Sequence, residues 1–435
     1  MNRVEQLNQA APLLRGLTLA QPSRWLLRTF LCTYVAISLI DPMDQMFHLK
    51  STLFITVLAI WFLRACLGYT KRCRLSLWGI LIALALIIPL AATLIGLLSG
   101  RNPESGPMFS TAEMFLMAFL VLVLTSEEIN LVSILNRECI VVALITLGIS
   151  ITAAFSPLLY AAIYEFTDSK QVAYLSAEAD SIGLGLGSFY YKTCATLILP
   201  LGYYTARFYS QRSHRVRNLL LALVYSSALV LSGARANVLA AAAVVGVFSI
   251  KKIRDVLGWE VAIPVSLIVL VLATASLLPG FFKPTEYSNA IKLGHWSSYI
   301  TEFDQHPYYM LWGEGTNTEF YSAGFEKNTI ITELTYVEFV RNFGIPVTFL
   351  FLVTLSWPLV PLLGARARAS GLSYVAISYG AYLLMSASNP LLLNTTGMLV
   401  VTSVWGTVLT LQEGNTARNL TDRTDAGIVQ KLSKT

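Results

Sequence analysis

Arg235 is the residue in this sequence best suited to bind a phosphate group. It follows a short apolar stretch and the small-residue turn Ser232-Gly233-Ala234. A guanidinium presents a planar fork of donors that matches phosphate oxygens, and it stays charged at any working pH. We predict an anion site around Arg235, with an ordinary interfacial arginine as the alternative. A second cation, Lys192, follows a glycine-rich segment, and it is expected either in this site or reaching the lipid headgroups.

The polar segment 280–341 combines aromatic rings with carboxylates. The ring faces of Trp296, Tyr299 and Trp312 suit the CH-rich faces of sugars, and an aromatic belt at the headgroup level is the alternative. Glu333 and Glu338 come directly before the next apolar run, where desolvation raises the pKa of a carboxyl group. One of these two carboxylates, or His295, is the candidate base that would accept a proton from a hydroxyl nucleophile.

No metal or cofactor motif accompanies these residues. The four histidines are scattered without metal-ligand spacing, and the pattern His-Glu-x-x-His is absent. The sequence also has neither a Walker loop nor a dinucleotide fingerprint. It therefore predicts no metal site and no bound cofactor, so energy must come from the substrate or from a gradient.

The composition indicates that these residues are carried by a membrane protein. Only 13% of the 435 residues are charged, about half the fraction usual in soluble domains, and the mean hydropathy is +0.61. The net charge of +6 is spread over short loops rather than gathered in a basic stripe, so a nucleic-acid partner is not expected.

The apolar residues form runs long enough to cross a bilayer. They predict an all-α fold, a polytopic transmembrane bundle of about 12 spans. The runs are 25–41, 51–69, 77–98, 109–125, 139–160, 188–207, 218–232, 237–250, 260–279, 342–363, 372–388 and 391–411. Arg28 and Arg64 lie near predicted cytoplasmic ends, where we expect them to reach the headgroups.

The distribution of lysine and arginine gives the orientation. With the N-terminus inside, the inner segments hold 20 basic residues and the outer segments hold seven. Both termini are therefore predicted to be cytoplasmic. The expected organisation is a cytoplasmic segment 1–24, a transmembrane domain 25–411 with large outward loops 161–187 and 280–341, and a disordered cytoplasmic tail 412–435.

Three segments of the second half resemble the bacterial O-antigen polymerases (Wzy-type) and the related O-antigen ligases. Segment 231–235, Leu-Ser-Gly-Ala-Arg, is similar to an apolar-Thr/Ser-Gly-x-Arg element, and Arg235 and Gly246 have the Arg-x10-Gly spacing of polymerases. In the outer loop, His295-Trp296 and segment 306–315 resemble an aromatic helix that leads into a Gly-x-Gly turn. Segment 336–346 is similar to the family's closing segment before the tenth span.

This resemblance implies glycosyl transfer from an undecaprenyl diphosphate-linked oligosaccharide at the periplasmic face of the bacterial inner membrane. Membrane lipids, a flippase and a chain-length-determining co-polymerase are the implied partners. Basic residues would stabilise the diphosphate leaving group, and a base would deprotonate the acceptor hydroxyl. The implied catalytic residues are Arg235, Glu333, Glu338 and His295, and the implied substrate-binding residues are Lys192, Arg341, Trp296, Tyr299, Trp312, Gly313 and Gly315.

Two other functions remain open. A ligase would transfer the glycan to lipid A-core, but ligases typically have a histidine at the position of Glu333. A lipid-linked oligosaccharide flippase would also have about twelve spans, although its outer loops are normally short.

Overall fold

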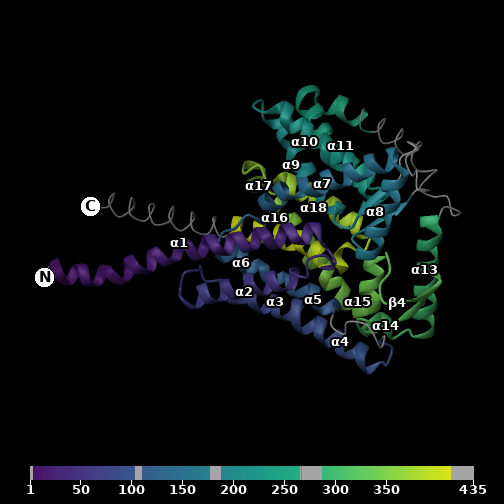
Figure 1. Ribbon diagram of the computed structural model, residues 1–435, viewed down its shortest axis with the longest axis horizontal. Helices are drawn as coiled ribbons and strands as arrows, with labels where there is room; N and C mark the ends of the chain where they lie inside the picture. Colours follow the sequence, from purple (N-terminus) through teal and green to yellow (C-terminus); the bar gives the residue numbers. More distant parts are fainter. Residues whose placement is uncertain (1–2, 103–109, 177–187, 265, 267–286, 413–435) are drawn as a thin grey trace.

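The computed structural model describes residues 3–102, 110–176, 188–264, 266 and 287–412, and these are mostly helical. The helices pack into one bundle from which α1 extends at one end, while α13 stands along the opposite edge (Figure 1). The first half comprises α1 (Arg3–Ile40), α2 (Lys50–Cys66), α3 (Leu75–Ile82), the π-helix η1 (Ala83–Ile87), α4 (Ile88–Leu98), α5 (Ser110–Leu116), η2 (Met117–Phe119), α6 (Leu120–Ser126), α7 (Leu131–Phe155) and α8 (Pro157–Lys170).

The second half contains the elements that carry the candidate site. They are β1 (Ala173–Ser176), β2 (Ser188–Tyr191), η3 (Cys194–Leu197), α9 (Ile198–Ser210), α10 (Arg215–Leu231), α11 (Arg235–Leu257), α13 (Tyr287–Gln305), α14 (Tyr309–Trp312), β3 (Phe320–Ser322), β4 (Lys327–Thr329), α15 (Thr335–Ser356), α16 (Leu359–Leu363), α17 (Ala365–Ala369), α18 (Ser373–Ser386) and η4 (Leu391–Leu393). A last helix covers 395–412.

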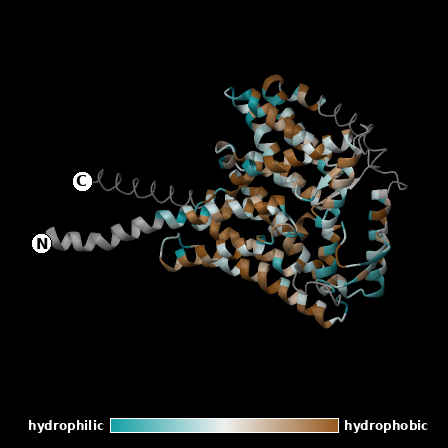
Figure 2. Cartoon of the chain, in the orientation of Figure 1, coloured by the Kyte–Doolittle hydropathy of each residue, from teal (hydrophilic) through white to brown (hydrophobic). Residues whose placement is uncertain are grey.

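Four helices of the described part are long and apolar enough to cross a membrane. They are Leu75–Leu98, Leu131–Thr152, Arg235–Leu257 and Thr335–Leu363. Many large hydrophobic side chains are exposed, among them Phe62, Leu98 and Leu158. Most helices of the bundle are rich in hydrophobic residues, whereas α13 and the segments beside it contain more hydrophilic ones (Figure 2). A membrane protein is the class that such an apolar surface indicates, whereas the count of twelve spans stays a prediction.

The segment between α7 and α9 differs from the predicted loop and span. The Ser156 hydroxyl accepts the backbone N–H of Leu159 and Pro157 begins α8, a combination that starts a new helix. Residues 157–170 of the expected run and loop are therefore helical. Residues 188–191 form a strand, antiparallel to β1, so the predicted span 188–207 is helical only from η3 onward. Residues 177–187, most of the run 260–279 and the tail after 412 lie outside the described residues.

Arg64 corrects a second expectation, because it does not reach the headgroups. Its side chain is buried, and its Nε donates to Oε1 of Glu127 at 2.7 Å. A guanidinium nitrogen of Arg64 also donates to the Ser23 hydroxyl, and Arg24 donates to the Glu127 carbonyl at 2.6 Å. This ion pair joins α1 and α2 to the turn after α6.

A kink in α15 provides the attachment point for the large loop. Gly344 has φ 75° and ψ 166°, and Pro346 follows inside the same helix. Proline has no N–H to donate to the carbonyl four residues earlier, which belongs to Asn342. The loop uses the carbonyls that are released here: Glu314 N–H donates to Arg341 at 2.6 Å, and Gly315 N–H donates to Asn342 at 3.3 Å.

Glycines on both sides make this contact close. A Cβ added at Gly344 would lie 2.3 Å from the Leu311 carbonyl oxygen, and one added at Gly313 would lie 2.5 Å from the Asn342 carbonyl oxygen. Both glycines also have positive φ, a conformation that L side chains rarely adopt. The loop and the kinked helix are therefore packed backbone to backbone.

Replacing Gly344 by alanine is expected to destabilise the fold by about 2–4 kcal/mol, because the change adds both strain at positive φ and a steric clash. Thermal unfolding of the purified protein in detergent measures this effect. Gly148→Ala in α7 is the matched control, since nothing lies within 4 Å of an added Cβ there. Equal unfolding midpoints for the two variants would contradict the packing described for the kink.

Candidate functional site

Arg235 is the first residue of α11 and faces α13. The turn before it contains Gly233 with φ 70°, and Asn237 holds this turn through a 2.9 Å hydrogen bond from Nδ2 to the Ser232 hydroxyl. Nη1 of Arg235 lies 3.5 Å from Oδ1 of Asn289 on α13. A helix N-terminus adds backbone N–H donors and a partial positive charge to the guanidinium. This end of α11 is therefore an electropositive position suited to an anion.

The first turns of α13 bring a second cation and a carboxylate close to this position. Lys292 lies three residues after Asn289, on the same side of the helix. Its Nζ is 3.8 Å from Oε2 of Glu333, and about a third of each side chain is exposed. Burial raises the pKa of Glu333, and the charge of Lys292 opposes that shift. Glu333 thus combines partial access with a raised affinity for a proton.

Lys192 is half-buried and lies two residues before the start of η3. α9 and α10 pack against each other and are joined by residues 211–214, so η3 at the start of the pair lies beside the end of α10. Both β2 and η3 contact α10. The fold therefore places Lys192 at about the same depth as the turn that leads into Arg235.

His295 fastens α13 to the β3–β4 hairpin. The imidazole is buried, and its Nδ1 lies 2.7 Å from the Ser322 hydroxyl. The Phe325 ring packs edge-on with its centroid 4.4 Å from that of His295. Burial, together with the nearby Lys292, lowers the pKa of His295 to about 4, so the ring is neutral at physiological pH. Within the described residues its Nε2 is enclosed without a hydrogen-bond partner.

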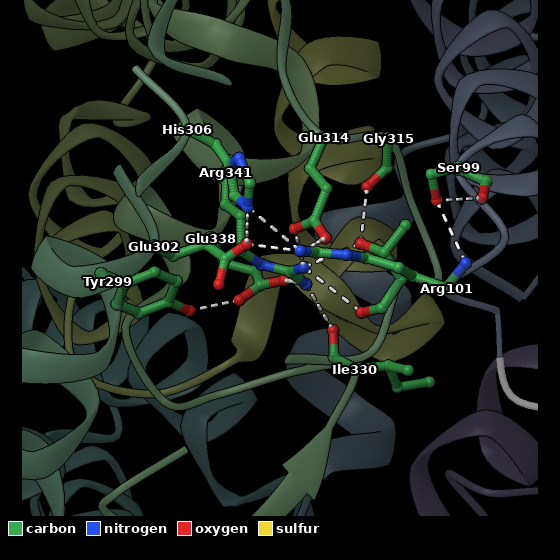
Figure 3. A network of polar contacts seen from close by, with 12 residues as sticks. Ser99, Arg101, Tyr299, Glu302, His306, Glu314, Gly315, Ile330, Glu338 and Arg341 are labelled. Carbon is green, nitrogen blue, oxygen red and sulfur yellow. Dashed lines mark hydrogen bonds and ion pairs between the residues drawn. The ribbon is translucent and has the colours of Figure 1, made fainter. Parts of the chain in front are cut away.

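A network of buried charges lies farther along α13, around Arg341 of α15 (Figure 3). Nη1 of Arg341 donates to Oε2 of Glu314 and to the Thr318 hydroxyl, both at 2.8 Å. Nη2 donates to the Ile330 carbonyl at 2.9 Å and to Glu338. The Phe320 ring covers the guanidinium, with its centroid 4.3 Å away.

Arg101 extends the network to the loop after α4. Its Nη1 donates to Glu302 at 2.5 Å and to Glu314 at 2.8 Å, and its Nη2 lies 3.2 Å from Nε2 of His306. Glu314 therefore accepts from Arg101 with one oxygen and from Arg341 with the other, as Figure 3 shows. The result is a bridge between α4 and α15 that passes through the large loop.

The network contains three of the predicted site residues. Tyr299 is buried and donates its hydroxyl to Glu338, so its ring cannot stack on a sugar. Glu338 and Arg341 are fully buried and bonded to each other, so neither contacts a substrate in this structure. All three therefore hold the fold together in this structure, and their roles in catalysis or substrate binding stay predictions. Trp296 and Trp312, in contrast, are 51% and 75% exposed and present open ring faces.

Gly313 and Gly315, two further predicted substrate-binding residues, lie in close backbone contact with helices. Gly313 packs on the α15 kink as described above. A Cβ at Gly315 would lie 2.2 Å from the backbone nitrogen of Gly96 on α4, and the Thr316 N–H donates to the Ala92 carbonyl at 3.0 Å. The two glycines of the Gly-x-Gly turn therefore allow the loop backbone to approach α15 and α4 closely.

Sequence reasoning missed the residues that complete both clusters. Arg101 and Lys292 counted only as outer basic residues, and Glu302 and Glu314 only as solvated loop charges. Their pairing joins residues as much as 213 positions apart, which no local spacing reveals. Among the described residues, no group of three or more His, Cys, Asp or Glu could hold a metal ion.

No family model matches the chain, and neither a curated protein nor a solved structure does so.

Removing Arg341 is expected to destabilise the protein strongly. Arg341→Ala leaves Glu338 buried without its counter-charge and leaves Glu314 paired with Arg101 alone, and breaking such a buried ion pair typically costs about 3–5 kcal/mol. Arg366→Ala is the control, because Arg366 is exposed and such changes stay within about 0.5 kcal/mol. Thermal unfolding in detergent compares the two variants. A similarly small loss of stability in both would show that the buried ion pairs of Arg341 contribute little.

The attachment of α13 to the hairpin is expected to weaken in acid. An unfolded histidine has a pKa near 6.5, while that of His295 is about 4, so the neutral ring stabilises the contact fully above about pH 6.5. This stabilisation decreases as the pH falls from about 6.5 to about 4. Hydrogen exchange of residues 320–329, corrected for intrinsic rates, measures it. His295→Asn should remove the pH dependence, and an equal dependence in the variant would exclude His295 as its source.

Proposed function

We propose that the chain is an O-antigen-type polymerase, a glycosyltransferase that joins undecaprenyl diphosphate-linked repeat units at the periplasmic face of the bacterial inner membrane. In this proposal it has about twelve spans, cytoplasmic termini and periplasmic loops 161–187 and 280–341. The observation that carries it is the group formed by Arg235 at the start of α11, Asn289 and Lys292 on α13, and Glu333. Cations can stabilise a diphosphate leaving group, and the partly exposed carboxylate of Glu333 beside them can accept the proton of the acceptor hydroxyl.

Each charged side chain has one role in the proposed reaction. The acceptor hydroxyl oxygen bonds to the anomeric carbon of the donor sugar, and the bond from that carbon to the phosphate oxygen breaks. The electron pair leaves with the diphosphate, whose charge Arg235, Lys292 and the N-terminus of α11 stabilise. Lys192, at a similar depth, assists in holding the diphosphate.

Glu333 is the base that takes the hydroxyl proton. Of the three candidates, Glu338 is fully buried against Arg341 and His295 is enclosed by the hairpin, whereas about a third of the Glu333 side chain is exposed. Its raised pKa also brings its proton affinity closer to that required of a general base. Trp296 and Trp312 offer ring faces to the sugars. The chain requires no metal or cofactor for these steps, and a flippase and a chain-length-determining co-polymerase are its expected partners.

Deleting the gene alone and examining lipopolysaccharide on a gel tests the function. A polymerase predicts one repeat unit on lipid A-core without the long ladder, because flipping and ligation still operate. Bare core would instead support a ligase or a flippase. An unchanged ladder would contradict an O-antigen role.

Arg235→Ala, expressed in the deletion strain, is expected to reduce polymerisation by about 100-fold or more, in line with the loss of one preorganised charge donor. Arg235→Lys should retain part of the activity, because the point charge remains without the planar fork. The control is Arg212→Ala, at the exposed end of the α9–α10 pair, which should leave the ladder intact. A full ladder from Arg235→Ala at normal expression would remove Arg235 from the site.

A further inference from the structure

An apolar groove lies within the bundle, away from the charged clusters. It lies between α3, η1, the α5–α6 segment, α15, η4 and the helix 395–412, and its empty space is about 730 Å³ when the part open to the outside is included. Residues that line it include Leu84, Ala118, Phe339, Thr354, Thr402 and Trp405. Two of its walls belong to the candidate membrane spans Leu75–Leu98 and Thr335–Leu363.

The groove presents hydrocarbon surface to whatever fills it. Its two polar residues are threonines whose hydroxyls are already bonded within their own helices. Thr354 donates to the Leu350 carbonyl at 2.8 Å, and Thr402 donates to the Met398 carbonyl at 2.6 Å. A ligand that needs hydrogen bonds would lose them here, so only an apolar chain fits this lining.

The groove is continuous with the lipid-facing surface of the two spans. Ile80 lines it and is half exposed. On the other span, Phe349 and Val353 are exposed next to the groove residue Thr354. These side chains face the bilayer in a membrane-spanning helix, so hydrocarbon chains can enter from the side. Water in such an apolar groove would lack the polar partners that it needs, so hydrocarbon chains are the occupants that suit it.

We propose that this groove binds an acyl chain of a bilayer phospholipid. The isoprenoid chain of a polyprenyl diphosphate is a poorer fit because of position. α11, which carries Arg235, packs on α9, α10 and α18, and none of these lines the groove. In Figure 1, α11 and α3 lie on opposite sides of the bundle. A diphosphate held at Arg235 would direct its chain elsewhere.

The acyl chain supports the part of α15 that carries the buried charges. Phe339 follows Glu338 directly and lines the groove, together with Phe351 and Phe115. Phe351 stacks on Phe115 at 5.3 Å between centroids and meets Phe343, beside the kink, at 5.1 Å. An acyl chain that packs on these rings contacts α15 on its lipid-facing side. The large loop packs on the opposite side of the same helix.

Photolabelling tests this site. The full chain is placed in nanodiscs of phosphatidylethanolamine and phosphatidylglycerol, a fraction of which carries a diazirine in one acyl chain. We expect label to concentrate on the α5–α6 segment and on 395–412. Thr354→Phe fills the groove and should reduce this label by about tenfold, because a built-in clash excludes the ligand.

Val353→Phe is the matched control, since it adds the same bulk one residue away on the exposed face and should leave labelling unchanged. If Thr354→Phe does not fold, as judged by gel filtration and thermal unfolding, Ala118→Leu replaces it. Equal labelling of all exposed apolar faces in both variants would overturn the proposal. Loss of the groove label on adding a polyprenyl diphosphate would assign the groove to the isoprenoid chain instead. None of these outcomes depends on whether the protein polymerises glycans.

Discussion

The buried guanidinium of Arg341 is the interaction on which the half of the molecule with the large loop depends. Burying a charge is costly unless it is paired and hydrogen-bonded, and Arg341 meets this condition with Glu314, Glu338, the Thr318 hydroxyl and the Ile330 carbonyl. Because these partners come from the loop and from α15 itself, the charge can be satisfied only when the loop is closed on the helix. The kink supports the same contact, since the Arg341 and Asn342 carbonyls accept from the loop backbone.

The network also sets the position of the more exposed cluster. Tyr299 ties α13 to Glu338, and His295 ties it to the hairpin, so the two residues fix the rotation of one helix. With that rotation, Asn289 contacts Arg235 and Lys292 approaches Glu333. Charges that are fully buried thus position the structure, and charges that remain partly exposed are those available for chemistry.

Sequence patterns predicted much of the architecture and little of the network. Apolar runs indicated the helices, and a small-residue turn placed Arg235 where a helix begins. Burial could not be predicted: Arg64 and Arg341 resemble any arginine at a span end, and their carboxylate partners are remote or lie in a loop of solvated charges. Tyr299 has the composition of a sugar-stacking residue but packs inward, because helix rotation depends on contacts with segments still unplaced. The strand 188–191 was missed since an apolar run of that length suits either structure.

The most direct test of the account is polymerisation by the purified chain in liposomes supplied only with an undecaprenyl diphosphate-linked repeat unit. The account predicts a ladder of longer lipid-linked glycans and release of undecaprenyl diphosphate, both lost in Arg235→Ala and Glu333→Gln, while Arg212→Ala remains active. Products that stay at one repeat unit with the correctly folded wild-type protein, or an active Arg235→Ala variant, would contradict it.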